Sequence, residues 1–259
     1  MINALFLGAG VYIFGSLARQ ISARRADPSA ETLRGFSWGD AVLAALLASW
    51  FVLNITASAS HNVTSMRTRD LAANALVSIA LLLFVALFLR LRGFNLEALA
   101  GFSKIGFGRT ICTGAVLLLA AYPLIFLADA ISQRVLGAAS EKQGIVELFN
   151  ASDTLTQRVL IIVLAVAIAP VAEEFLFRFF LYGVLKRYLG RLVALLVSAA
   201  LFAAVHAHLP SLAPLFVLGS CFTLAFEWSG SILVSMTMHA LFNSLTLIAL
   251  AFPELFQQQ

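Results

Sequence analysis

The stretch IAPVAEEFLFRFFLYGVL, residues 168–185, decides the fold of this chain. It places Glu173, Glu174 and Arg178 inside an apolar run whose length approaches the roughly 20 residues that cross a bilayer. A charged side chain at the bilayer centre costs about 2.5–3.5 kcal/mol even on the most lenient insertion scales. These three charges therefore need partners, a cavity or both.

The rest of the chain has the same apolar character. Of its 259 residues, 61% are hydrophobic and 12% are charged, and the mean hydropathy is +0.95. Soluble domains are about 45–50% apolar and about 25% charged. We therefore expect an all-α, polytopic membrane protein with about eight transmembrane helices, forming one membrane domain over residues 1–259. The expected spans are 2–18, 39–57, 71–91, 110–131, 158–185, 192–209, 212–227 and 231–251.

The net charge of +4 does not indicate a nucleic-acid partner, because the Lys and Arg residues gather at the ends of the apolar runs. Most of them fall in the first, third and fifth connections, which share one side of the membrane if the chain has eight spans. Cytoplasmic connections carry an excess of Lys and Arg. This asymmetry predicts membrane lipids as neighbours and both termini outside the cytoplasm.

The spacing of the three charges divides them into two roles. Glu174 and Arg178 are four residues apart, so they share a helix face and pair in the favourable acid-first order. Glu173 is turned by about 100° from Glu174 and cannot use Arg178 equally well. We expect a buried Glu174–Arg178 pair that holds helices together, with Glu173 left to face a cavity. Pro170 removes a backbone donor, which frees the carbonyl of Val166 and bends the helix.

The next helix is expected to bring a histidine to the same depth. Lys186 and Arg191 bracket the connection between the two helices, and Glu173 and His206 lie at similar sequence distances on either side of it. At about 1.5 Å per residue, both lie roughly 20 Å from the same membrane face. An antiparallel hairpin thus pairs an acid with a histidine.

The last span adds His239 and Asn243, whose four-residue spacing puts the imidazole and the carboxamide on one face. A single histidine inside a membrane often serves only as an interhelical hydrogen-bond donor. Two histidines, one spare glutamate and one asparagine on neighbouring helices favour a shared site instead.

These groups fit hydrolysis by water. A glutamate and a histidine at one depth can activate a water as a general base, and a histidine and an asparagine one turn apart offer two donors for an oxyanion. No His-Glu-x-x-His motif is present, which excludes the usual zinc-protease helix. A zinc site built from Glu173, His206 and His239 remains possible at this point.

Three short patterns together resemble one family. Glu173-Glu174-x-x-x-Arg178, Phe202-x-x-x-His206 and His239-x-x-x-Asn243, in this order on late spans, are similar to the CPBP family of CAAX-protease and bacteriocin-processing membrane proteins, also called the Rce1/Abi group. The resemblance covers residues 158–247. One departure is Phe179, where many members have glycine after the arginine.

The resemblance implies an intramembrane endopeptidase of a prokaryotic inner membrane. It implies that Glu173 and His206 activate water, that His239 and Asn243 stabilise the oxyanion, and that Glu174 and Arg178 support the base. It also favours a metal-free glutamate mechanism without a cofactor. In prenyl-protein members the substrate is the C-terminal tripeptide that follows a lipidated cysteine, so a peptide or lipidated protein is the expected partner.

Two functions from other classes compete with the protease. A proton-coupled transporter could use Glu173 and the histidines as a relay. It would be expected to show inverted repeats, and the sequence shows no such symmetry. A non-catalytic immunity or scaffold protein could keep the fold while losing the site, but Glu173, His206 and His239 are all present.

Overall fold

The computed structural model describes residues 4–24, 35–60, 68–136, 149, 152, 154–252 and 254. In these ranges the regular structure is helical, and seven helical stretches are long and apolar enough to cross a membrane. This confirms the polytopic all-α prediction. The stretches are α1 (Ala4–Ala23), α2 (Trp38–Ser60), α3 (Thr68–Leu91), α5 (Phe107–Leu136), the composite helix 155–189, α11 (Leu212–Ser229) and α12 (Ile232–Ala251). An eighth apolar helix, α10 (Arg191–Ala204), is shorter.

The composite helix is not uniform along its length. It runs through α7 (Leu155–Val163), the π-helical segment η3 (Leu164–Ile168), α8 (Ala169–Glu174), the π-helical segment η4 (Phe175–Tyr182) and α9 (Gly183–Leu189). The short α8, with both glutamates at its end, therefore lies between two π segments. Wide π turns inside α-helices are frequent at functional sites.

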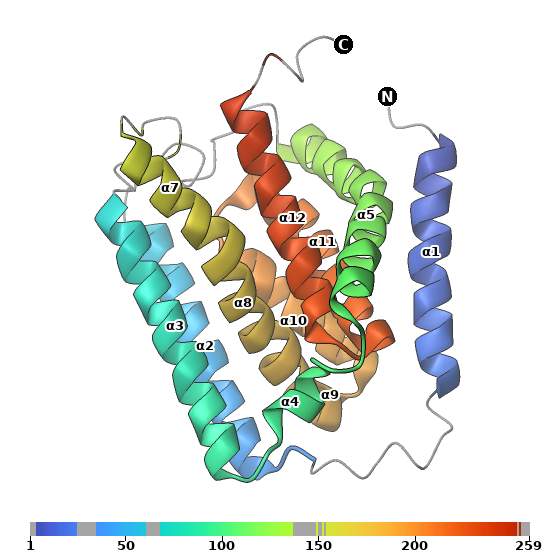
Figure 1. Ribbon diagram of the computed structural model, residues 1–259, viewed down its shortest axis with the longest axis vertical. Helices are drawn as coiled ribbons and strands as arrows, with labels where there is room; N and C mark the ends of the chain where they lie inside the picture. Colours follow the sequence, from blue (N-terminus) through green and yellow to red (C-terminus); the bar gives the residue numbers. More distant parts are fainter. Residues whose placement is uncertain are drawn as a thin grey trace.

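Helix α12 lies at the centre of the bundle (Figure 1). It packs against α5, α11, η3 and α8. Helices α10 and α11 pair with one another, and α1 covers α5 and α11 at one edge. Helix α3 packs against η3, α8 and η4, while α2 contacts α9 and α10. The glutamate-bearing helix is therefore enclosed by neighbours on several sides.

The alternating helices give the bundle two distinct ends. At what we call the basic end, α1, α3, α9 and α11 finish, and α2, α5, α10 and α12 begin; it is the lower end in Figure 1. The short helix α4 (Leu96–Ala100) lies there too. The opposite end, which we call the open end, holds the first residue of α1 and the last residue of α12.

One acidic residue at the basic end, Glu227, is surrounded by partners. Glu227 of α11 accepts hydrogen bonds from Tyr182 and Lys186, and Nε of Arg191 lies 2.8 Å from Oε1 of the same carboxylate. This cluster, which we call the Glu227 clamp, joins η4, α9, α10 and α11. Its net positive charge at a helix junction is typical of the membrane surface rather than of the bilayer interior.

A second junction ties α2 to the end of α3. The backbone N–H of Ser37 donates to Oδ2 of Asp40 at 2.6 Å, and Arg92 donates from Nη2 to the Ser37 hydroxyl at 2.6 Å. Nε of Arg92 lies 3.6 Å from Oδ1 of Asp40, whose side chain is fully buried. Both junctions join helices at the basic end.

One predicted span ends early. The sequence analysis expects a helix over 192–209 that contains His206, but α10 ends at Ala204 and an irregular turn follows. Ala207 has a φ of 47°, outside the right-handed helical region, and Pro210 cannot donate a helical hydrogen bond. The chain restarts at the short 3₁₀ turn η5 (Leu209–Ser211). Non-helical backbone at membrane depth is tolerated where protein covers it or where it lines a water-filled cavity.

Candidate active site

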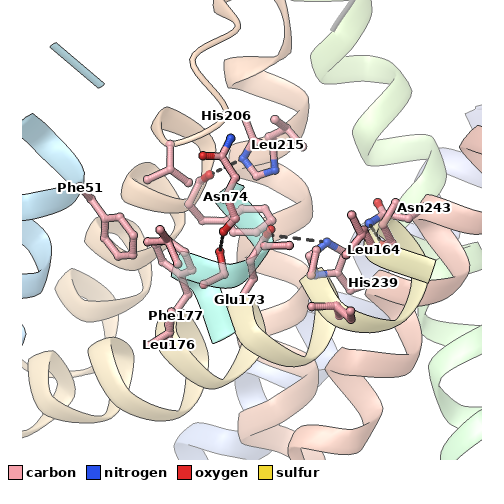
Figure 2. A pocket seen from close by; sticks show the side chains of 18 of the residues that line it. Phe51, Asn74, Leu164, Glu173, Leu176, Phe177, His206, Leu215, His239 and Asn243 are labelled. Atoms are coloured by element: carbon pink, nitrogen blue, oxygen red, sulfur yellow. Dashed lines mark hydrogen bonds and ion pairs between the residues drawn. The ribbon is translucent and has the colours of Figure 1, made fainter. Parts of the chain in front are cut away.

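A pocket of about 450 Å³ opens among α2, α3, η3, α8, α10, α11 and α12. Glu173, His206, His239 and Asn243 all line it, as the close view in Figure 2 shows. Glu174 and Arg178 do not line it and are fully buried behind its wall. The structure therefore places four of the six polar residues in one cavity and the other two together in the protein interior.

Glu173 is the carboxylate that faces the pocket. Its side chain is 25% exposed, whereas that of Glu174 is 0% exposed. Oε2 of Glu173 has no hydrogen-bond partner among the described residues, and Nε2 of His239 lies 3.9 Å away from it (Figure 2). A gap of this size is too wide for a direct hydrogen bond. It leaves the carboxylate free to bind a water or a substrate group.

Glu174 and Arg178 form the pair that their spacing predicts. Nη1 of Arg178 lies 3.2 Å from Oε1 of Glu174, and Nη2 donates to the carbonyl of Gly219 at 3.3 Å. The guanidinium also stacks over the ring of Phe202, with its carbon 4.0 Å from the ring centre. Because both partners are fully buried, each cancels a charge that would otherwise be costly.

Glu174 has a second contact, with His239, that the sequence analysis missed. Nδ1 of His239 lies 3.0 Å from Oε1 of Glu174. Since a carboxylate only accepts, Nδ1 carries the hydrogen and Nε2 is directed to the pocket, toward Glu173. The imidazole is also stacked on Phe222, with ring centres 5.1 Å apart. The buried acid therefore sets the orientation of the histidine.

His206 is held by the backbone instead of by a carboxylate. Its Nδ1 lies 2.8 Å from the carbonyl of Phe202, one of the carbonyls at the end of α10 that lack an intrahelical donor. A carbonyl only accepts, so Nδ1 carries the hydrogen and a neutral ring keeps Nε2 as an acceptor. The early end of α10 thus produces a histidine that can take a proton in the pocket.

Asn243 is fixed by an irregularity in η3. Its Nδ2 donates to the carbonyl of Ala165 at 2.7 Å. In the π segment the N–H of Ala169 bonds to Leu164, and the next residue, Pro170, has no N–H to offer Ala165. The carbonyl with an outside donor is therefore that of Ala165, not that of Val166 as the sequence analysis expects. Asn243 keeps one amide hydrogen and its carbonyl oxygen for a ligand.

The sequence of residues 155–245 matches the family model described as "Type II CAAX prenyl endopeptidase Rce1-like". This segment is therefore similar to the Rce1-like family. The match confirms the CAAX-protease resemblance drawn from the three short patterns, and it includes all six polar residues. No curated protein and no solved structure matches the chain. The chain is thus a multi-pass membrane protein with a segment similar to CAAX-protease-like intramembrane peptidases.

Three further residues of the Rce1-like segment shape the site, although the sequence analysis did not assign them roles. Phe202 contacts both histidine rings, with centres 5.0 Å from His206 and 5.8 Å from His239, and it also lies over Arg178. Phe222 stacks on His239. At Gly219 a Cβ would lie 2.9 Å from Phe202 and 3.1 Å from Arg178. A small residue in mid-span is the signal for such close packing.

The sequence leaves a zinc site open as an alternative. Among the described residues, no three His, Cys, Asp or Glu side chains come together in a way that could hold a metal ion. Nδ1 of His206 is engaged by the Phe202 carbonyl and Nδ1 of His239 by Glu174. These contacts leave Nε2 of each ring for another ligand, so the zinc set of Glu173, His206 and His239 stays an alternative prediction.

A serine-hydrolase pattern lies outside the Rce1-like segment. Residues 35–39, Gly-Phe-Ser-Trp-Gly, spell Gly-x-Ser-x-Gly, but they lead into α2 at the basic end. The Ser37 hydroxyl accepts from Arg92 and contacts Asp40, and it does not line the pocket. These residues belong to a helix junction, so the Rce1-like pocket remains the candidate site.

Proposed function

We propose that this protein is an intramembrane endopeptidase that hydrolyses a peptide bond with a water activated by Glu173 and His206. The observation that carries the proposal is the arrangement around Glu173. Its Oε2 is unpartnered among the described residues, in a pocket shared with the acceptor nitrogen of His206 and with Nε2 of His239. A free carboxylate inside a membrane has no evident structural use.

In the proposed reaction, Glu173 takes a proton from a water whose position it shares with Nε2 of His206. The water oxygen bonds to the carbonyl carbon of the peptide, and the carbonyl oxygen becomes an oxyanion. The C–N bond then breaks, and Glu173 passes its proton to the leaving amine. The products are a carboxylic acid and an amine, and transfer of the acid's proton to the amine gives a carboxylate and an ammonium group. A positioned base of this kind contributes about 10²–10⁴-fold to the rate.

The oxyanion would be stabilised by His239 and Asn243. Protonated His239 donates from Nε2 while Glu174, at 3.0 Å from Nδ1, balances its charge. The free amide hydrogen of Asn243 supplies a second donor, since its partner hydrogen is committed to Ala165. Both donors are held in place before substrate binds, which is what makes such a site effective. Arg178 positions Glu174 and acts through it.

The pocket walls indicate the kind of peptide that binds. Beside the four polar residues they are mainly aliphatic and aromatic, which suits an apolar, extended segment rather than a charged one. The family description names a CAAX prenyl endopeptidase, and the family resemblance in the sequence offers one candidate substrate, the C-terminal tripeptide of a prenylated protein. We assign the protein to the inner membrane of a prokaryotic cell, where a lipidated or membrane-anchored peptide could reach the pocket.

The test is cleavage of a prenylated and a non-prenylated peptide library by the protein purified in detergent. Wild type is compared with Glu173→Ala, His239→Ala and the control Glu97→Ala, which removes an exposed acid of α4. Cleavage by wild type and the control, but by neither site variant, is expected. If both site variants still cleave, the assignment of Glu173 and His239 to the active site is wrong. A stoichiometric zinc content that disappears in His206→Ala would overturn the metal-free mechanism.

A further inference from the structure

The pocket is confined to one half of the bundle. Helix α2 contributes residues from 50–55, near its end, whereas α3 contributes 74–81, near its start. Helix α11 contributes Leu215 and Leu218 from its first half, and α12 contributes residues only from His239 onward. Because neighbouring helices run in opposite directions, all these segments lie in the half of the bundle next to the open end.

The other half is closed below the pocket. Arg178, Phe180 and Phe222 are fully buried there, and Phe177 is 2% exposed. The Glu227 clamp and the Asp40–Arg92 junction then seal the basic end. A substrate or water therefore has no described route from the basic end to Glu173, and the pocket is reached from the open end.

The two ends differ strongly in positive charge among the described residues. The open end carries Arg69, Arg134 and Arg158. The basic end carries Arg19, Arg24, Arg90, Arg92, Lys104, Arg109, Lys186, Arg187 and Arg191. Such an excess next to spans marks the cytoplasmic side, and acidic partners change this rule little. The basic end is therefore the cytoplasmic end.

Aromatic anchors support the same placement of the membrane surface. Trp38, at the start of α2, packs against Tyr188 of α9 with ring centres 5.2 Å apart, and both are exposed. Trp228, at the end of α11, donates from Nε1 to Gln20 at 3.0 Å. Trp and Tyr rings gather at membrane–water interfaces, so this level of the basic end is an interface.

We infer that the pocket opens on the non-cytoplasmic side of the membrane, and that its substrate is an apolar peptide segment next to the non-cytoplasmic end of a membrane-spanning helix. The substrate part of this inference rests on the proposed peptidase function. The mouth suits such a segment, because Asn54 and Asn74 lie among Trp50, Phe51 and Ile55. Figure 2 labels Asn74 and His206 among the residues that line the pocket. Amide side chains can bind a peptide backbone, while the rings and Ile55 accept apolar side chains.

This substrate class differs from the one in the family description. A prenylated tail that reaches the membrane from the cytoplasm would meet the basic end, where the described helices are packed closed. A segment exposed outside the cytoplasm, or in the outer half of the bilayer, would meet the mouth directly. The orientation of the pocket thus selects the substrate.

The orientation can be measured without any substrate. In a Cys112→Ser/Cys221→Ala background, single cysteines are placed at Asn74 in the mouth, at Gln133 near the end of α5, and at Glu97 of α4. Intact cells are treated with a membrane-impermeant maleimide. Labelling at positions 74 and 133 before permeabilisation, and at position 97 only after it, is expected. The reverse pattern at 133 and 97 overturns the inference, even if the cysteine at 74 disturbs folding.

The substrate class is tested with two reporter libraries. Each is a single-span protein with a variable apolar segment, placed either outside or inside the cytoplasm, and co-expressed with wild type or Glu173→Gln. Cleavage of the outer library alone, lost in Glu173→Gln, is expected. Glu173-dependent cleavage of the inner library overturns the inference. If neither library is cleaved, the proposed peptidase function and the substrate class both fail, while the labelling pattern still decides the orientation.

Discussion

Two carboxylates, one in each half of the bundle, have opposite surroundings. Glu227 at the basic end is bonded to Tyr182, Lys186 and Arg191. Glu173 in the pocket has an oxygen without a hydrogen-bond partner among the described residues, and its nearest basic atom, on His239, lies 3.9 Å away. Both acids lie in apolar sequence, yet only Glu227 has hydrogen-bond partners for both of its carboxylate oxygens.

The difference separates acids that hold the fold from acids that are available for chemistry. Buried polar groups normally have partners, so an unpartnered one needs a separate explanation. Glu174 lies between the two cases, because it is bonded both to Arg178 and to His239. Its contact with Arg178 stabilises the fold, and its contact with His239 orients a residue of the site.

Glu173→Gln should give the largest effect and separate activity from stability most sharply. The glutamine keeps the shape of the side chain but cannot accept a proton from water. Activity should therefore fall by about 10³-fold or more, within the range for a lost general base. Thermal stability in detergent should not fall, because the carboxylate has no close ion pair to lose. If Glu173→Gln lowers stability but leaves the cleavage rate at the wild-type value, Glu173 holds the fold and is not the catalytic base.

Arg178→Met should be the most destabilising single change. It leaves Glu174 buried without its cation, which costs about 3–5 kcal/mol. Unfolding in a denaturing detergent titration measures the loss. The double variant Glu174→Gln/Arg178→Met removes both charges and should recover a large part of that stability. If the double variant is less stable than Arg178→Met alone, the buried pair is not the source of the effect.

Asn243→Ala should reduce activity by about 10²-fold, the usual size for one lost oxyanion donor. Its donation to Ala165 is also lost, so a stability decrease of about 1 kcal/mol should accompany it. Steady-state kinetics distinguishes the two roles, because a lost oxyanion donor lowers kcat with little change in KM. Thr246→Ala, one turn further along the same pocket wall, is the matched control. An equal fall in both variants would assign Asn243 a packing role only.

The sequence predicted the fold class and the pairing of Glu174 with Arg178, because hydropathy and four-residue spacing are local properties. It also grouped Glu173, His206, His239 and Asn243, which the structure places in one pocket. Three features needed the structure: the early end of α10, the π segments around α8 and the Glu174–His239 bond. The Glu174–His239 bond, and the bond from Asn243 to Ala165 in η3, join segments far apart in the chain, whereas α10 ends next to the local break at Ala207 and Pro210. Spacing within one helix does not contain that information.

Glu227→Gln should have the smallest effect and the opposite character to Glu173→Gln. Glutamine keeps one accepting oxygen, which can take the place of Oε1 opposite Arg191, while its NH2 group faces the Tyr182 hydroxyl and the charge that attracts Lys186 is lost. A loss of about 1–2 kcal/mol in stability is expected, the usual size for a hydrogen bond to a charged group. Activity per folded molecule should be unchanged, because the clamp joins helices far from the pocket mouth.

Thermal unfolding and peptide cleavage, measured on the same preparation, test this last comparison. The Glu227 clamp lies at the cytoplasmic end in the inferred orientation, where water and salt reach Lys186, whose side chain is 41% exposed. High salt should therefore weaken the wild-type clamp and narrow the stability gap between wild type and Glu227→Gln. The fully buried Glu174–Arg178 pair should not respond in this way. If the stability difference between wild type and Glu227→Gln does not change with salt, the charge of Glu227 is no more accessible to ions than that of the buried Glu174–Arg178 pair.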